Sequence, residues 1–197
     1  MKYLELKMKN KNLKTKAGYE YLLAYKITVP IYDYTVEFVK RWINGRSRTK
    51  DQMEQAARSG MTNIAEGNKQ KSLELYIKLA GISRGSLEEL LKDYLSFARQ
   101  NSIDIWDKQR CVREIREIGQ IWEIIKKNPT LPDSPNFPNL PHDKEKAVNL
   151  MLTLINQANY LLDKLVEALL KKHQEKGGFS ENLLKRRIEY RSIKLKQ

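Results

Sequence analysis

Residues 63–90 read NIAEGNKQKSLELYIKLAGISRGSLEEL, and this stretch decides the fold that the sequence predicts. One helix ends inside it, and Gly67 is well placed to stop that helix. A second helix begins near Ser72, whose hydroxyl suits an N-cap because it can accept a bond from a free backbone N–H. The corner between the two helices gathers Asn63, Glu66 and Gly67 with several lysines. The corner is either a functional site or a structural turn, and the rest of the chain must decide which.

The helix before the corner is expected over about residues 49–66, with Thr49 as its N-cap. Its apolar face is built of small residues, which let a neighbouring helix approach closely: Ala56, Ala57, Gly60 and Ala65. That face places this helix at the centre of a bundle. The helix after the corner is expected over about 72–100, and we expect Gly81 and Gly85 inside it to allow close packing as well.

Four further helical patterns lie outward from this pair, over about residues 19–44, 106–127, 144–173 and 180–195. Pro30 lies inside the first pattern and is expected to kink or split it, while Gly45 takes the position of a C-cap glycine. Five of the six prolines fall in residues 128–141, which we therefore expect to be an extended connector.

The pattern over residues 144–173 carries two adjacent rows of apolar side chains, which indicate either oligomerisation or cover by the helix at 106–127. We predict an all-α protein, an antiparallel up-down four-helix bundle with an inserted helix and a short basic C-terminal helix. The expected domains are a flexible basic N-terminal segment over 1–16, the bundle over 17–178 with a helical insertion at 103–142, and a basic suffix helix over 179–197.

The formal net charge of +13 is concentrated at the two ends of the chain. Residues 1–16 contain six lysines and one glutamate, and residues 171–197 contain nine Lys or Arg and three glutamates. The ends therefore carry +5 and +6, and the 154 residues between them carry only +2. Such ends indicate a polyanionic partner, either nucleic acid or an anionic membrane surface, or else they are solubilising tails. Composition alone leaves these alternatives open.

The sequence contains few signals of an enzyme, a metal site or a membrane anchor. Its two histidines, His142 and His173, are not paired with cysteines or carboxylates at metal-ligand spacing. No phosphate-binding loop or dinucleotide fingerprint is present, and Cys111 is the one cysteine, so an internal disulfide is impossible. Because no apolar run approaches the roughly 20 residues of a membrane span, we expect a soluble cytoplasmic protein. We expect no catalytic residue, metal or cofactor, although catalysis by lysines or carboxylates alone would leave no such signature.

Two groups of cations are candidates for a polyanion site. The first lies near the corner and comprises Arg58, Lys69, Lys71, Lys78 and Arg84. An ordinary solvated helix face is the commoner meaning of such a group. The second lies in the last helix and comprises Lys185, Arg186, Arg187, Arg191 and Lys194. On a helix, positions 187, 191 and 194 fall on one side with Tyr190 beside them, and such a face suits a phosphate backbone.

The polar residues of the corner are expected to be structural. We expect Asn63, Glu66 and Gly67 to hold the turn, with the Glu66 carboxylate bonded to backbone donors that the turn exposes. Any function then lies on the surfaces around the corner.

The longer stretch AARSGMTNIAEGNKQKSLELYIKLAGISRGSLEEL, residues 56–90, resembles the four-helix-bundle family encoded in intervening sequences of bacterial 23S rRNA genes. The resemblance is carried by the NIAEG run over 63–67 and the GSLEEL run over 85–90. The family also includes the accessory variability proteins of diversity-generating retroelements, which look like pentameric barrels that bind a reverse transcriptase and nucleic acid. The resemblance implies a homo-oligomer, with a pentamer favoured, and by analogy a protein partner such as a reverse transcriptase.

The NQANYLL run over residues 156–162 resembles the longer "suffix domain" branch of that family, so the resemblance extends over most of residues 19–190. The function that we expect is non-catalytic, largely sequence-tolerant binding of RNA or DNA by an oligomeric bundle that serves as an adaptor to a nucleic-acid enzyme. The alternative is a structural or protein-interaction scaffold with no nucleic-acid role.

Overall fold

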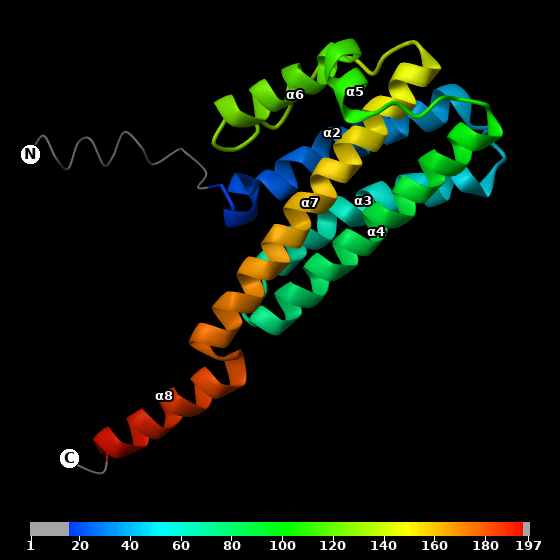
Figure 1. Ribbon diagram of the computed structural model, residues 1–197. Helices are drawn as coiled ribbons and strands as arrows, with labels where there is room; N and C mark the ends of the chain where they lie inside the picture. Colours follow the sequence, from blue (N-terminus) through cyan, green and yellow to red (C-terminus); the bar gives the residue numbers. More distant parts are fainter. Residues whose placement is uncertain (1–15, 195–197) are drawn as a thin grey trace, which may run out of the picture.

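The structure, a computed structural model, describes residues 16–194, and all of its regular secondary structure there is helical (Figure 1). Four long helices form a bundle: α2 (Leu23–Trp42), α3 (Arg48–Asn68), α4 (Leu73–Gln100) and α7 (Lys144–Lys176). One 3-10 turn, η1 (Gly18–Tyr21), precedes α2. The all-α class and the bundle are thus confirmed, while the basic segment predicted over 1–16 lies outside the described residues except for Lys16.

The four helices of the bundle enclose one apolar core. Helix α3 packs between α2 and α4, and α7 packs between α4 and α2, so the helices close a ring. All four contribute side chains that are fully buried: Ile27, Phe38, Met53, Ile64, Leu87, Tyr94, Met151 and Ile155. Each large apolar side chain contributes about 1.5–3 kcal/mol when it is removed from water. Burial of these apolar residues, which recur at helical spacing in the sequence, therefore stabilises the closed bundle.

Neighbouring helices run antiparallel on both sides of α4. Only residues 69–72 separate α3 from α4, so the chain turns straight back on itself. Between α4 and α7, Glu74 contacts His173 and Arg84 contacts Asp163, so residue numbers rise along one helix as they fall along the other. This register brings the start of α4 to the end of α7.

Helix α2 bears on two predictions about the first helix. Of the kink or split expected at Pro30, the split does not occur, because Pro30 lies buried within a helix that continues to Trp42. The chain then leaves the helix through Ile43, whose backbone is extended (φ −104°, ψ 135°). Gly45 is therefore not a C-cap glycine, because the helix ends without a left-handed residue.

Both ends of α3 also differ from expectation. Its N-cap is Ser47, whose Oγ accepts a hydrogen bond from Thr49 N at 3.2 Å, so Thr49 lies in the first turn. At its other end the helix runs through Gly67 to Asn68, so Gly67 does not stop it.

The insertion between α4 and α7 folds as two short helices, α5 (Lys108–Glu114) and α6 (Arg116–Lys127), and not as the single helix predicted. The helix breaks at Ile115 (φ −113°, ψ 88°), whose side chain is buried in the core. Helix α6 lies against α2 and α7 and buries its own apolar face: Ile118, Ile121 and Ile125. The insertion thus covers part of the wide apolar surface of α7. Residues 128–143 contain no helix, as their prolines predict.

Helix α8 (Phe179–Lys194) follows α7 and projects away from the bundle (Figure 1). Gly177 allows the turn between them because its φ is +72°, which glycine adopts without steric cost. Asn182 Nδ2 donates to the carbonyl oxygens of Lys176, Gly177 and Gly178 at 2.9, 3.3 and 2.9 Å. No residue of α8 is buried, so most of the surface of this helix is open to solvent.

Candidate nucleic-acid interface

Asn63 supports the contact between α3 and α4 indirectly. It lies on α3 before the corner, and its Nδ2 donates to the carbonyl and hydroxyl oxygens of Ser59, both at 2.9 Å. The Ser59 hydroxyl in turn lies 2.9 Å from that of Ser86 on α4. The Asn63 side chain therefore supports the pairing of two helices and not the turn itself.

The turn is closed by backbone groups and a serine. Gln70 N donates to the Gly67 carbonyl at 3.0 Å, and Ser72 Oγ accepts from Leu75 N at 3.2 Å as the N-cap of α4. The Glu66 carboxylate is exposed and makes no hydrogen bond among the described residues, in contrast to the bond predicted for it. The turn therefore does not depend on an acidic side chain.

Gly67 serves close packing between α3 and α4. A methyl group on Gly67 would lie 2.5 Å from Tyr76 Cδ2, so a side chain there would force the two helices apart. By contrast, a methyl group on Gly81 or Gly85 would meet no atom within 4 Å. The prediction that these two glycines allow close packing is wrong within this chain, because both face open space. The corner as a whole is a structural joint.

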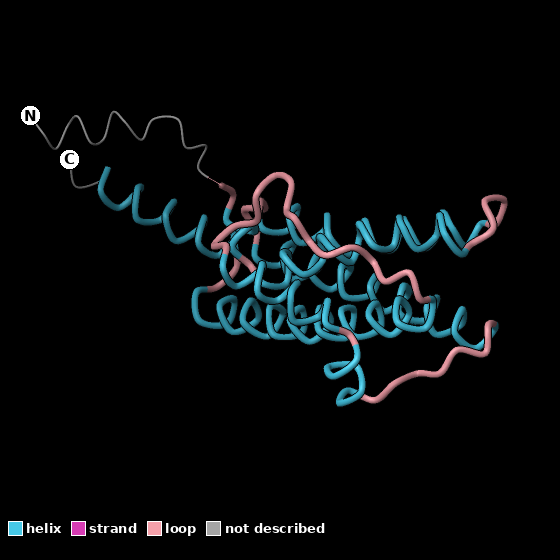
Figure 2. The backbone as a smooth tube through the Cα atoms, turned by 90° about the horizontal axis from the view of Figure 1, so that it is seen from above, coloured by secondary structure: helices cyan, strands magenta, loops and turns pink. Residues whose placement is uncertain are grey.

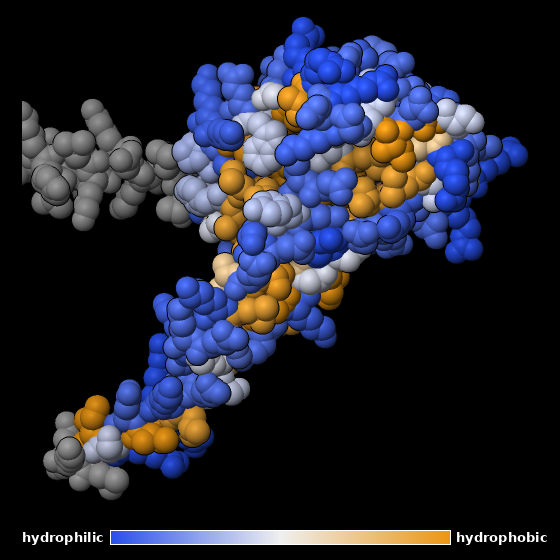
Figure 3. Space-filling view, viewed as in Figure 1, coloured by the Kyte–Doolittle hydropathy of each residue, from blue (hydrophilic) through white to orange (hydrophobic). Residues whose placement is uncertain are grey.

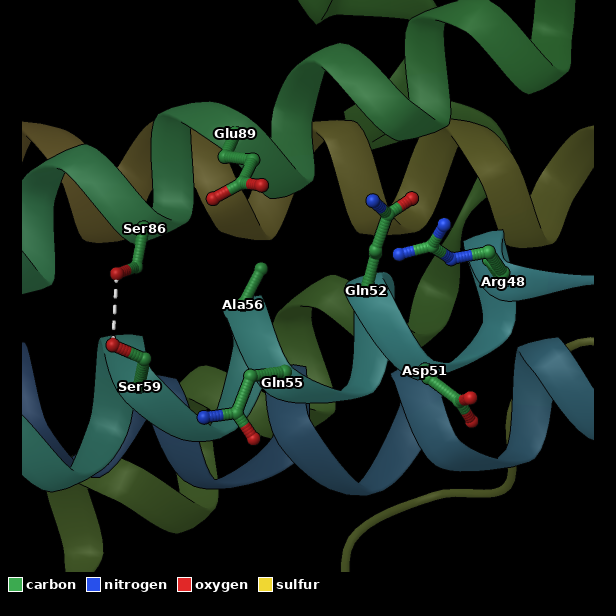
Figure 4. A pocket seen from close by; sticks show the side chains of 8 residues that line it. All are labelled: Arg48, Asp51, Gln52, Gln55, Ala56, Ser59, Ser86 and Glu89. Atoms are coloured by element: carbon green, nitrogen blue, oxygen red, sulfur yellow. Dashed lines mark hydrogen bonds between the residues drawn. The ribbon is translucent and has the colours of Figure 1, made fainter.

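A polar groove runs between α3 and α4 (Figure 4). Its lining comprises Arg48, Asp51, Gln52, Gln55, Ala56, Ser59, Ser86 and Glu89. Figure 4 shows Glu89 projecting from α4 toward the side chains of α3, with the Ser59–Ser86 bond nearby. Two carboxylates outnumber one guanidinium in this groove, so its charge does not favour a polyanion.

The first group of predicted cations is spread over the corner and two helices. Lys69 and Lys71 are exposed at the corner, with Lys69 Nζ 5.5 Å from the centre of the Tyr19 ring. Lys78 is exposed on α4. Arg58 is exposed on α3 about 15 Å along the helix from its end. Only Lys69 and Lys71 therefore lie together at the corner.

Arg84 forms ion pairs with two carboxylates. Its Nε lies 3.1 Å from Asp163 Oδ1 on α7, and its Nη1 lies 2.9 Å from Glu88 Oε2 on α4. The hydrogen bond from Arg84 is the main cause that lowers the pKa of Glu88. The charge of Arg84 is thus balanced within the chain, where it links α4 to α7.

The junction of α7 and α8 lies against the start of α4. His173 Nε2 is 3.0 Å from Glu74 Oε1, and the Ser72 hydroxyl donates to the other oxygen of Glu74. The pKa of Glu74 falls to about 2, chiefly through the Ser72 hydroxyl, then a backbone N–H and His173. A methyl group on Gly178 would collide with Glu74 Oε1, so the junction packs closely on this carboxylate.

Sequence reasoning missed this contact because Glu74 and His173 lie 99 residues apart. Only the antiparallel register of α4 and α7 could have indicated it. The contact matters here because it lies where α7 gives way to α8.

The second group of predicted cations lies exposed on α8: Lys185, Arg186, Arg187, Arg191 and Lys194. Since an α-helix turns by about 100° per residue, Arg187, Arg191 and Lys194 lie within about 60° of arc. Tyr190 lies beside them with 67% of its surface exposed. Figure 3 shows hydrophilic and apolar surface side by side along this arm.

The corner, the end of α7 and the start of α8 all lie at one end of the bundle. Tyr19 of η1 lies beside Lys69 at the end of α3, and His173 lies beside Glu74 at the start of α4. Figure 2 shows α8 leaving the bundle at the end where the described chain begins. We call this region the basic end and define it by its exposed cations: Lys69, Lys71, Lys176 and the five cations of α8.

Three further observations concern other classes of site. No helix among the described residues is long and apolar enough to cross a membrane. Within residues 16–194, no three His, Cys, Asp or Glu side chains come together as a metal site. The thiol of Cys111 is buried and lies 3.8 Å from the Trp106 carbonyl oxygen.

Comparison with known proteins bears on the resemblance seen in the sequence. A family model described as "23S rRNA-intervening sequence protein" matches residues 20–123, just over half of the chain. No curated protein and no solved structure matches the chain significantly. The match runs from η1 into α6 and leaves out α7 and α8. The resemblance of those last helices to the suffix-domain branch therefore stays a prediction.

Proposed function

The chain belongs to the family of 23S rRNA-intervening sequence proteins, and on that premise we propose that it is a non-catalytic protein that binds RNA or DNA. The observation that supports this most is the cation face of α8, which stands clear of the bundle. Residues 171–197 carry +6, whereas the 154 residues of the body carry +2. The charge is therefore gathered where a long polyanion can reach it.

The chemistry of the face suits phosphate. Arg187, Arg191 and Lys194 lie on one side of α8, and none of them forms an ion pair among the described residues. Free guanidinium and ammonium groups displace the counterions that condense on a nucleic acid, and this release drives binding at moderate salt. Arg84, which is already paired, adds little to such a surface.

The binding is largely independent of base sequence. Base reading in duplex DNA uses two or more polar side chains that converge on the edges of bases in a groove. The α8 face instead offers cations spaced along one helix, an arrangement that contacts the backbone. Affinity therefore follows charge and salt more than sequence.

The resemblance to the family extends this proposal in two respects. We propose that copies assemble into a homo-oligomer, with a pentamer favoured, and that it serves as an adaptor to a nucleic-acid enzyme such as a reverse transcriptase. The cytoplasmic location is proposed separately, from the lack of a long apolar run in the sequence. The exposed face of α4 supports assembly, because Ile82 there is 43% exposed.

A second candidate function is a protein-interaction scaffold whose charge only keeps it soluble. One observation favours it: α8 also exposes Leu184 and Ile188, each 59% exposed, at about 60° and 100° around the helix from Arg187. An apolar row of this kind is typical of a protein contact.

Binding of labelled RNA and DNA, followed by fluorescence anisotropy over a range of salt, tests the two candidates. The full chain is compared with a triple variant R187Q/R191Q/K194Q and with a control variant K108Q/K126Q/K127Q, which removes three exposed charges from the insertion. If about six phosphates are contacted, the log–log slope of affinity against salt is roughly −4 to −5. The first variant should lower its magnitude by roughly 2–3, and the control should leave it unchanged.

Equal loss in both variants would mean that only net charge matters, and would remove α8 as the site. Absence of binding at low salt in the full chain would overturn the proposal and leave the scaffold.

A further inference from the structure

Helix α8 carries exposed apolar side chains on the same side as its cations. Phe179, Leu183, Tyr190 and Ile193 lie within about 80° of arc on the helix. Their exposed fractions are 43%, 56%, 67% and 61%, values that mark them as uncovered in this chain. Contact with phosphates alone would not remove these side chains from water, because a phosphate backbone is itself strongly hydrated. The apolar row needs a separate explanation.

The positive and negative charges of α8 lie on different sides of the helix. Four cations fall with the apolar row inside about 160° of arc: Arg186, Arg187, Arg191 and Lys194. Both carboxylates of the helix, Glu181 and Glu189, fall outside that arc. Glu181 is also engaged, since its Oε2 accepts from Gly178 N at 3.2 Å. One side of the arm is therefore both cationic and aromatic.

We propose that this side of α8 binds single-stranded RNA or DNA in preference to duplex, an inference that rests on the nucleic-acid function proposed above. In a duplex the bases are stacked within the helix, and the groove edges offer apolar contact chiefly through thymine methyl groups. An unpaired strand exposes the faces of its bases, which stack on aromatic rings while cations hold the phosphates. The interleaving of Tyr190 and Phe179 with arginines matches the second case.

The spacing along the helix fits an extended strand. Phe179 and Tyr190 lie eleven residues apart, so their rings are separated by about 16 Å along the helix axis. Leu183 lies between them on the same line, and Arg186 and Arg187 flank it. A strand that follows the helix axis meets Phe179 and Leu183, then a pair of arginines, and beyond them apolar and cationic side chains in turn.

A partner helix fits this side less well. The row follows the 4-3-4-3 spacing of a coiled-coil seam, but its middle position is occupied by Arg186. Closing a helix over the seam would bury that guanidinium between Leu183 and Tyr190, and a buried charge without a partner is costly. Pairing of two α8 helices would bring Arg186 against its own copy in either orientation. A strand supplies a phosphate at that point.

The test compares single strands with duplexes of the same length and sequence on the full chain, by anisotropy at one moderate salt concentration. Tyr190→Leu removes the ring and keeps an apolar side chain, while Tyr190→Phe keeps the ring. Tyr160→Leu is the matched control, because Tyr160 is 62% exposed on α7 with Lys164 Nζ 5.8 Å from its ring. Circular dichroism checks that helix content is unchanged in each variant.

We expect the single strand to bind at least tenfold more tightly than the duplex. Tyr190→Leu should weaken single-strand binding about tenfold and leave duplex binding unchanged, since one stacked base is worth a factor of this order. Tyr190→Phe and Tyr160→Leu should bind like the unmodified chain.

Equal affinity for single strand and duplex, or equal loss in Tyr190→Leu and Tyr160→Leu, would overturn the single-strand inference and leave the proposed function intact. Failure of every nucleic acid to bind at low salt would overturn the proposed function itself. Single-strand binding that an acidic peptide helix displaces stoichiometrically, without any loss in Tyr190→Leu, would assign the apolar row to a protein partner instead.

Discussion

At the scale of single residues, glycines on the paired helices α3 and α4 differ in what they contact. A methyl group on Gly60 would lie 2.5 Å from Leu87 Cδ2, so this glycine lets α3 and α4 approach. Gly85 lies on the opposing helix only two positions before Leu87, yet it faces open space. The difference is one of direction around the helix, since neighbouring positions point about 100° apart.

We predict that alanine distinguishes the two classes. Gly60→Ala and Gly67→Ala should each destabilise the fold by about 1–3 kcal/mol through overpacking. Gly81→Ala and Gly85→Ala should be neutral or stabilise it by up to about 1 kcal/mol, because alanine is the better helix former. Urea denaturation measures all four, with light scattering as a check that each variant keeps its assembly state. Similar losses in all four would contradict this account of the packing.

Lys26 is a second residue whose role emerges only in three dimensions. Its side chain is buried, and Nζ donates to the carbonyl oxygens of Ile125, Asn128 and Pro129 at 2.8, 3.0 and 3.3 Å. The ammonium thus satisfies carbonyls that the end of α6 leaves free. Burial lowers the pKa of Lys26 below its ordinary value.

Lys26→Met should therefore cost about 1–3 kcal/mol of unfolding free energy, because buried carbonyls lose their donor. Lys40→Met on the exposed side of the same helix should cost much less. Urea denaturation of both variants decides the point. If the two variants unfold at the same urea concentration, the cap on α6 contributes nothing.

At the scale of elements, α8 depends on the bundle for its position but contributes nothing to its core. None of its residues is buried, whereas α6 buries three isoleucines against α2 and α7. The two appended elements thus differ in kind: the insertion is part of the core, and α8 is an arm.

Ending the chain after Gly178 should consequently leave the bundle intact. We expect the thermal midpoint of residues 1–178 to stay within a few degrees of the full chain, since a loss of less than about 1 kcal/mol moves it no further. Circular dichroism on heating measures this. A large drop in the midpoint would show that α8 stabilises the bundle through contacts with another copy.

The contact between α4 and the α7–α8 junction should depend on pH. The pKa of Glu74 is lowered to about 2, first through the Ser72 hydroxyl, so the folded state favours the ionised carboxylate. Its contribution is present above the ordinary carboxyl range near 4.3 and is lost as the pH falls toward 2. Glu74→Gln should remove this part of the acid dependence.

The measurement is the thermal midpoint between pH 6 and pH 2, with Glu66→Gln as control. Glu66 lies on the same corner, and its carboxylate makes no hydrogen bond among the described residues. The unmodified chain and Glu66→Gln should lose stability in parallel, and Glu74→Gln should lose less below pH 4.3. Parallel curves for all three chains would mean that the Glu74 contact does not hold the junction.

At the scale of the whole molecule, the fold gathers charge from distant parts of the sequence. Lys69 and Lys71 from the corner, Lys176 from the end of α7 and the cations of α8 all belong to the basic end. The described chain also begins there, at Lys16, directly after the lysine-rich residues 1–15. If the basic end binds nucleic acid, both ends of the chain should act on the same strand.

We therefore predict that five lysines before Lys16 add to the binding by α8: Lys2, Lys7, Lys9, Lys11 and Lys14. Changing all five to glutamine in the full chain should lower the magnitude of the salt slope, and the effect should add to that of R187Q/R191Q/K194Q. Anisotropy with one labelled strand measures each variant. An unchanged slope would confine the contacts to α8 and the corner.

The existence of the helices could be predicted from the sequence because helix formation is local. Apolar spacing of three and four located α2, α3, α4, α7 and α8 to within a few residues, since each backbone bond joins positions four apart. Charge is a property of composition, so the concentration of cations in α8 could be seen in the sequence, while their contact with nucleic acid stays a prediction. The helix ends were less reliable: Ser47 caps α3 in place of Thr49, and Gly67 lies inside the helix it was expected to end.

Only the tertiary structure decided how the helices pack against one another. The break at Ile115 buries a side chain that an unbroken helix would direct differently, and Lys26 meets carbonyls about a hundred residues away. The Glu74–His173 contact likewise joins positions 99 residues apart. Such pairings depend on how faces with similar patterns dock, and the sequence pattern specifies that a face is apolar but not which face covers it. The sequence by itself therefore determined the elements and the charge, while packing determined their register, the joint at the corner and the place where the cations meet.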